Sequence, residues 1–168
     1  MLELNLVEEK FASSCVKAMH FVGDEKIELR KLVKIVFIAD LLARNEAGRH
    51  KSLTGMVYIA DKLGPVPSRD SQPLPQREML EAYCAKHSIG LEIVGDLVVR
   101  SRANTEVITD SDDFKFIGTA ARQFHKYTAD ELSAITHQFP AWFKTPLGDV
   151  ISDELMTRLF RIGDPEEM

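Results

Sequence analysis

The chain has 168 residues, of which 45% are hydrophobic and 28% are charged, and its formal net charge is −5. This composition excludes disordered and fibrous proteins, and the length is typical of one folded domain. No apolar stretch is long enough to span a membrane and the N-terminus lacks the basic start of a secretory signal, so we expect a cytoplasmic protein.

Charge is distributed unevenly along this chain. Through Arg69 there are 11 Lys and Arg residues against 9 Asp and Glu, whereas the remainder has 10 against 17. An acidic protein has no overall attraction for phosphates, which argues against nucleic acid as a partner. The basic residues near the start of the second predicted helix are interpreted as an ordinary solvated face: Lys26, Arg30, Lys31 and Lys34.

The first part of the chain is predicted to form two helices. Apolar residues recur every three or four positions from Asn5 to Val22, which is the pattern of an amphipathic helix, and Gly23 ends it. A second helix starts near Lys26. Because it is apolar on nearly every face from Leu32 to Leu42, we expect it to run through the centre of a bundle.

Turn residues dominate the next segment. A loop is predicted for 45–53, because Gly48 stands where a helix would end. Thr54-Gly55 then precedes a predicted helix of about two turns over Met56–Leu63. Gly64-Pro65-Val66-Pro67 would end that helix, since the prolines fix φ and forbid its continuation. An extended surface loop is expected for 68–76.

The second half of the chain is predicted to be mostly helical. Helices are expected over 76–87, 114–126 and 153–161, with a further helix that begins at the capping box of Thr128 and Glu131. A β-hairpin is predicted for 91–100 around Gly95-Asp96, with 105–109 as a candidate third strand. The expected fold class is therefore mainly α, a compact helical bundle with one small β-hairpin. It should form a single domain over 1–163, followed by a frayed acidic tail at 164–168.

Asp40 is the first candidate functional residue, because it lies in the most apolar helix. Burying a lone carboxylate is costly unless it is paired or hydrogen-bonded. Its candidate partners are Thr54, Tyr58, His137 or a backbone amide at the Thr54-Gly55 turn. We favour a structural role over a catalytic one, since no nucleophile or second carboxylate is recognisably placed beside it.

His137 and Trp142 form the second candidate pair, on either side of the helix break at Pro140. An imidazole and an indole at this spacing could meet at one groove and anchor a partner, because Trp is enriched in interface hot spots. The alternative, which we favour, is that Trp142 fills the core while His137 bonds a backbone carbonyl.

No pattern in the sequence predicts a cofactor, a metal site or a catalytic residue. Cys15 and Cys84 are isolated thiols that we expect to be buried and reduced. Cys84-x-x-His87 lacks a second pair of ligands, and Asp110-x-Asp112-Asp113 lacks the glycine and distal glutamate of a calcium loop. These residues are interpreted as helix ends and caps.

Three blocks of residues resemble the motifs of one known family and follow the order that they have in that family. The first is a Lys-Leu-x-Lys-Leu-apolar-Tyr/Phe-x-Ala-Asp helix, which is similar to residues 31–40. The second combines Thr-Gly-x-x-Tyr-x-Ala with Gly-Pro-apolar-Pro, as at 54–60 and 64–67. The third is Thr-Ala-x-x-Leu-Ser followed by Thr-His and Pro-x-Trp, as at 128–142. Together they resemble the Panacea, or SocA-like, antitoxin domain.

The resemblance implies a mostly helical antitoxin that neutralises a cognate toxin protein by direct contact. Some relatives deliver the toxin to a protease, so a cellular protease is a further expected partner. The expected contact regions are the 64–67 turn, the 68–76 loop and the surroundings of Trp142. The resemblance and the candidate pairs together assign these partner-binding or motif residues: Asp40, Thr54, Gly55, Tyr58, Gly64, Pro65, Pro67, His137 and Trp142.

Two rival functions are kept. One is a nucleic-acid-binding regulator of the winged-helix type, with Met56–Leu63 as recognition helix and Gly95-Asp96 at the tip of the wing. The other is a hydrolase that uses Asp40 and His137, which requires one pocket that contains both residues and a nucleophile.

Overall fold

The computed structural model describes residues 1–46, 51–100 and 113–158. Of these residues 52% are helical and 17% are in strands. The helices are α1 (Leu6–Val22), α2 (Leu29–Asn45), α3 (Gln76–His87), α4 (Asp113–Phe124), α5 (Ala129–Thr136), α6 (Pro140–Phe143) and α7 (Asp153–Met156). The strands are β1 (Lys26–Glu28), β2 (Tyr58–Asp61), β3 (Gly64–Arg69), β4 (Gln72–Pro73), β5 (Leu91–Val94) and β6 (Leu97–Arg100).

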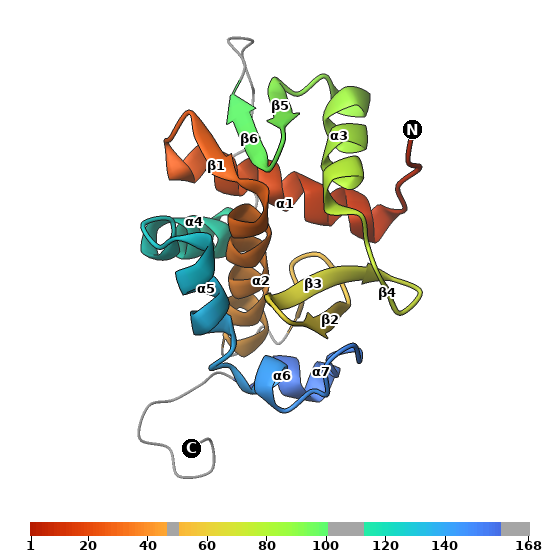
Figure 1. Ribbon diagram of the computed structural model, residues 1–168, viewed down its shortest axis with the longest axis vertical. Coiled ribbons are helices and arrows are strands. Elements are labelled where there is room, and N and C mark those ends of the chain that lie inside the picture. Colours follow the sequence, from red (N-terminus) through yellow and green to blue (C-terminus); the bar gives the residue numbers. More distant parts are fainter. Residues whose placement is uncertain (47–50, 101–112, 159–168) are drawn as a thin grey trace.

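Helix α2 is the centre around which the other elements pack. It contacts α1, α4 and α5, and Figure 1 shows it running between the two sheets. All residues from Leu32 to Leu41 are buried, including the charged Lys34 and Asp40. The prediction of a central apolar helix is therefore confirmed. The three residues before it, Lys26–Glu28, form strand β1 instead of its first turn.

Two three-stranded antiparallel sheets flank α2, in the strand orders β1-β6-β5 and β2-β3-β4. The predicted hairpin over 91–100 is present as β5 and β6, but β1 adds to it and a second sheet stands beside it. The fold is thus α+β, and the prediction of a mainly α bundle with one hairpin is wrong.

The error lies in residues 56–76, which were expected to form a helix and a loop. Tyr58 and Ala60 belong to the main core, whereas Ile59 between them is buried outside it, as expected for a strand whose successive side chains lie on opposite, covered faces. Pro65 and Pro67 pair with Ala60 and Tyr58 inside the sheet instead of ending a helix. Ser68 donates its N–H to the carbonyl of Val57, and hydrogen-bonded and non-hydrogen-bonded pairs alternate along an antiparallel ladder. The nitrogens of Pro65 and Pro67 therefore point away from β2, so their lack of an N–H removes no bond between β2 and β3.

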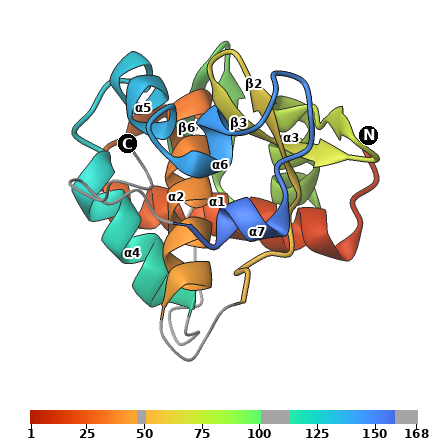
Figure 2. The same ribbon diagram turned by 90° about the horizontal axis from the view of Figure 1, so that it is seen from below.

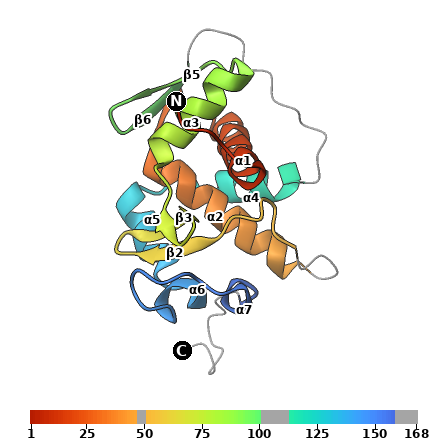
Figure 3. The same cartoon turned by 90° about the vertical axis from the view of Figure 1, so that its right-hand side faces the viewer.

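The C-terminal part of the chain covers the other edge of β2. Gly148 donates its N–H to the carbonyl of Ala60 at 2.8 Å, and Ala60 donates to Asp149 at 3.0 Å. The N–H of Ile151 bonds the carbonyl of Tyr58 at 2.8 Å. Figures 2 and 3 show α6 and α7 beside β2. This end of the fold is therefore assembled from segments that lie far apart in the sequence.

Local capping signals were read correctly. Thr128 and Glu131 form the predicted capping box of α5, and Asn5 and Glu8 form a second box at the start of α1. Ser152 caps α7, which ends at Met156. The candidate strand at 105–109 and the tail at 164–168 lie outside the described residues, as do residues 110–112 before α4. Among the described helices, none combines the length and apolarity needed to cross a membrane.

Gly64 is the position at which the turn between β2 and β3 tolerates no side chain. Its φ is +118°, and an added Cβ would lie 2.7 Å from Oγ1 of Thr136 and 3.2 Å from Cε of Lys34. We expect Gly64→Ala to lower the free energy of unfolding by about 3 kcal/mol, because backbone strain adds to a clash.

Gly148→Ala is the matched control for this prediction. Gly148 also has a positive φ, but an added Cβ would meet nothing within 4 Å. It should cost about 1 kcal/mol, from backbone strain alone. Urea denaturation of both variants measures the difference, and equal losses would contradict the close approach at Gly64.

Candidate functional site

The carboxylate of Asp40 joins α2 to the segment that leads into β2. Its Oδ1 accepts hydrogen bonds from the Ser52 hydroxyl and the Leu53 N–H, both at 2.8 Å, and its Oδ2 accepts one from the Tyr58 hydroxyl at 3.2 Å. Of the expected partners Tyr58 is confirmed, and the backbone amide is that of Leu53. Thr54 caps the N–H of Met56 instead. The network therefore holds the start of β2 against the core helix.

Burial dominates the electrostatics of Asp40. The side chain is completely enclosed, which raises its pKa, while the hydrogen bonds from Ser52 and Leu53 oppose that shift. Arg44 also opposes it, with Nε 3.9 Å from Oδ1 of Asp40. Arg44 extends to Asp153 at the start of α7, at 3.1 Å, so the same cation connects α2 to the C-terminal helix.

His137 and Trp142 do meet, at the far end of the β2–β3 hairpin. Their rings are stacked with centroids 3.7 Å apart and an angle of 17° between the planes. The indole N–H of Trp142 donates to the backbone carbonyl of Asp61 at 2.8 Å, and the backbone of Lys62 hydrogen-bonds the imidazole. The favoured contact of His137 to the backbone is present, whereas Trp142 does not fill the core: it is partly buried and packs against the core from outside. The stack thus clamps the β2–β3 turn.

Lys34 is the functional candidate that the sequence analysis missed. The prediction that it belongs to a solvated face is wrong, because only 2% of the residue is exposed. It lies beneath the turn at Gly64 and makes no hydrogen bond to a described residue. Burial lowers the pKa of its amine from 10.5 to about 8, and the nearby Arg30 adds to this. Its position inside a run of apolar residues was the available signal.

Two further polar atoms near this turn lack hydrogen-bond partners among the described residues. They are Nε2 of His137 and Oγ of Ser133, both shielded from solvent. Burial lowers the pKa of His137, the hydrogen bond to Lys62 opposes this, and the charge of Lys34 lowers it further. The imidazole therefore favours its neutral form.

Asp40 and His137 do not form a catalytic pair. Asp40 bonds residues that precede β2, whereas His137 bonds the turn that follows it. Within the described part of the chain, no group of three or more His, Cys, Asp or Glu residues is placed to hold a metal ion.

Most of the other predicted site residues are buried supports. Thr54, Tyr58, Gly64, Pro65 and Pro67 are all inaccessible, and only Gly55 is exposed. The buried residues support the β2–β3 hairpin, so another molecule would contact the exposed residues next to them.

Exposed apolar side chains gather around this hairpin. Of the eight large hydrophobic residues that the described chain leaves exposed, five lie directly before β2, in the turn after it or in residues 143–150. Val150 pairs with Ile59 of β2, and Phe143 follows Trp142 directly. We call these five residues, together with Trp142, the contact surface: Val57, Leu63, Phe143, Leu147 and Val150.

Comparison with known proteins gives one match. The family model described as antitoxin SocA-like, Panacea domain, matches residues 32–143. This range contains α2 from Leu32 onward, the β2–β3 hairpin and the stack of His137 on Trp142. No curated protein and no solved structure is detectably similar to the chain.

The Asp40 network generates a stability prediction. Asp40→Ala leaves the Leu53 N–H and the Tyr58 hydroxyl buried without an acceptor, so we expect the free energy of unfolding to fall by about 4 kcal/mol. Tyr58→Phe removes a single donor and should cost about 1 kcal/mol. Chemical denaturation measures both values. A loss for Asp40→Ala no larger than that for Tyr58→Phe would show that the network is not a support.

Lys34 generates a pH prediction. A folded-state pKa of about 8 against 10.5 in the unfolded chain means that the unfolded state binds more protons between these two pH values. Above pH 10.5 the amine of Lys34 is neutral in both states, so its burial carries no charge penalty. This stability is lost as the pH falls through about 8, where the buried amine becomes protonated. Relative to Lys34→Met, the wild type should therefore gain up to about 3 kcal/mol as the pH rises across this window.

Lys62→Met serves as the control for that comparison, because Lys62 is exposed on the same turn. Its difference from the wild type should stay constant over the same pH range. Urea titrations at several pH values give both differences. A wild-type advantage over Lys34→Met that shrinks with rising pH would contradict the assigned burial of the charge.

Proposed function

Because the chain belongs to the SocA-like antitoxin family, which is defined by the Panacea domain, we propose that it neutralises a cognate toxin protein by direct binding. The family match covers most of the central helix and the part of the contact surface formed by Val57, Leu63, Trp142 and Phe143, whereas Leu147 and Val150 lie beyond it. Membership implies a toxin partner in general terms, and the proposal adds the surface and the manner of binding.

The contact surface carries this proposal. Exposed apolar side chains that gather on one part of a folded protein mark interaction sites, and five of them lie on the segments next to the β2–β3 hairpin and to Trp142. Trp142 is held in place by its stack on His137 and its hydrogen bond to Asp61. A ring that is already ordered loses little conformational freedom on binding, which favours it as the anchor of an interface.

The buried residues act through this surface without touching the partner. Asp40 fixes Tyr58 at one end of β2, and the stack of His137 on Trp142 fixes the turn at the other end. The hairpin between them is thereby held rigid. An interface of standard size, about 1,600 Å² in total, would cover the active site of a toxin without any chemistry by this protein.

Delivery of the toxin to a protease is a compatible extension, in which the same complex is presented for degradation. Its mark is a shorter half-life of the toxin when this protein is present. The cytoplasm is the compartment in which we place both activities.

The two rival functions lose their structural basis. Residues 58–61, assigned to a recognition helix in the winged-helix alternative, form a strand inside a sheet. The hydrolase alternative required Asp40 and His137 in one pocket, and they bond different segments.

Toxin binding is tested with the product of the adjacent gene, co-expressed and purified with this protein. We expect a stoichiometric complex and restored growth. Trp142→Ala and Leu63→Asp should each weaken binding by about tenfold or more, because they remove the anchor or place a charge in the interface.

Val94→Asp is the matched control, since Val94 is an exposed apolar residue on β5, at the opposite end of the fold. It should leave the affinity unchanged while all three variants keep the wild-type circular dichroism spectrum. Equal affinity for all three variants would overturn the contact surface, and failure to recover any complex would count against the antitoxin function.

A further inference from the structure

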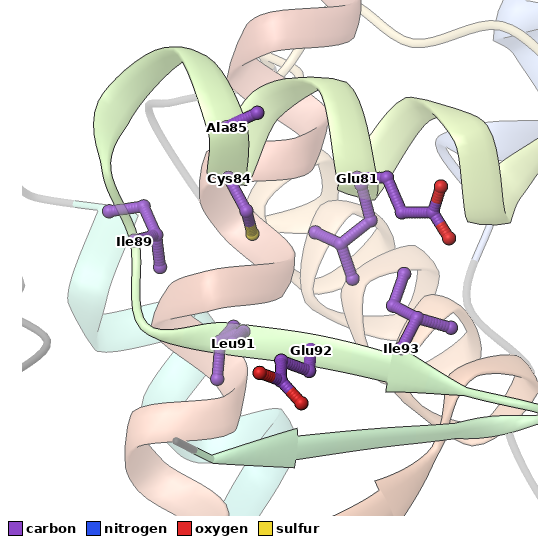
Figure 4. Close-up of a pocket in the computed structure, with 8 residues that line it drawn as sticks. Glu81, Cys84, Ala85, Ile89, Leu91, Glu92 and Ile93 are labelled. Atoms are coloured by element: carbon purple, nitrogen blue, oxygen red, sulfur yellow. The ribbon is translucent and has the colours of Figure 1, made fainter. Parts of the chain in front are cut away.

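A groove is lined by residues of α3, of strand β5 and of the loop between them. Figure 1 shows α3 and β5 at the end of the fold opposite to β2 and α6. The groove has a volume of about 390 Å³. In Figure 4, Cys84 points from α3 toward β5, and Ile93 points from β5 toward α3. Leu80, Ile89 and Leu91 complete an apolar lining. Burial raises the pKa of the Cys84 thiol to about 11, so the thiol stays neutral and contributes to this apolar surface.

Strand β5 forms one wall of the groove and is the edge of its sheet. Among the described residues it pairs only with β6. Val94 and Leu97 flank the two-residue turn, so they form a hydrogen-bonded pair and the bonding alternates along the strand. Ile93 consequently directs its backbone N–H and C=O away from β6. These groups are available to another strand.

The charges at the groove have one sign. Its lining includes two carboxylates, those of Glu81 and Glu92, and no lysine or arginine. Glu92 is exposed and forms no ion pair with a described residue, while Glu81 is paired with Arg77 at 2.8 Å across one turn of α3. An incoming cation would find an unpaired carboxylate on β5 and a second one on the facing helix.

We propose that this groove binds an extended basic segment of a partner protein, which adds as a strand to the free edge of β5. The backbone of the segment bonds Ile93, an aliphatic side chain enters between Leu80 and Ile93, and flanking lysines or arginines meet Glu92 and Glu81. A helix facing an edge strand is a geometry that suits strand addition, since backbone bonds give affinity and pockets for alternate side chains give selectivity.

This site is independent of the toxin-binding proposal. The groove belongs to the sheet β1-β6-β5, whereas the contact surface is built on β2 and residues 142–150. Both surfaces can be occupied at once, because the core of the fold separates them (Figure 1). The protein is thereby equipped to bring two partners together.

The probe is a fluorescein-labelled peptide of alternating lysine and valine with a central leucine, acetylated and amidated at its ends. We expect saturable binding by fluorescence anisotropy, with NMR shift changes concentrated in α3 and β5. The same peptide N-methylated at alternate residues cannot pair with the strand edge, and the version with glutamate in place of lysine is repelled. Both should lose binding.

Two variants and their controls decide the location. Ala85→Trp fills the groove from an exposed position on its rim and should abolish binding, whereas Ala134→Trp, exposed on α5, should leave it unchanged. Glu92→Lys should weaken binding about fivefold, and Glu25→Lys, at an exposed position next to the opposite edge of the sheet, should have no effect. Binding that survives N-methylation or Ala85→Trp would overturn the proposal, as would absence of binding by the basic peptide.

Discussion

The burial of the Asp40 carboxylate is the constraint on which this end of the fold depends. A carboxylate in the core of an apolar helix is tolerated only when donors surround it. The donors are Ser52, Leu53 and Tyr58. The chain after α2 must therefore return to this helix, and β2 must begin at the level of Asp40 along it. This return fixes the position of the β2–β3 hairpin, of its turn and of the Trp142 indole that packs on the turn.

Helix α2 carries two buried charges, and the fold treats them differently. Asp40 is satisfied by three donors, whereas Lys34, two turns earlier, has no hydrogen bond to a described residue. The amine lies under Gly64, and its charge acts on His137, whose buried Nε2 has no hydrogen-bond partner among the described residues. Locally unfavourable groups of this kind are retained at functional sites more often than elsewhere. Here they underlie the β2–β3 turn that presents the contact surface.

The fold class was wrong because one segment was assigned the wrong periodicity. Residues 56–63 are too short for helical spacing to be distinguished from alternation, and Gly64-Pro65 resembles a helix stop. In the structure Tyr58, Ile59 and Ala60 are all buried, so this strand is covered on both faces and shows no polar alternation that the sequence could have revealed. A strand at this position is stable only because β3 bonds one edge and residues 148–151 bond the other. Neither partner is apparent from the segment itself.

The sequence alone determined the features that depend on neighbours along the chain: the amphipathic α1, the apolar α2, the capping box at Thr128, the hairpin around Gly95 and the ordered motifs of the antitoxin family. The apolar surroundings of Asp40 in the sequence also predicted that hydrogen-bond donors must surround its carboxylate, and Tyr58 was one of the predicted donors. Only the tertiary structure decided that Lys34 is buried, that a second sheet exists, and that a groove opens beside β5. These features arise from contacts between distant segments, and periodicity and capping record only the local environment of each residue.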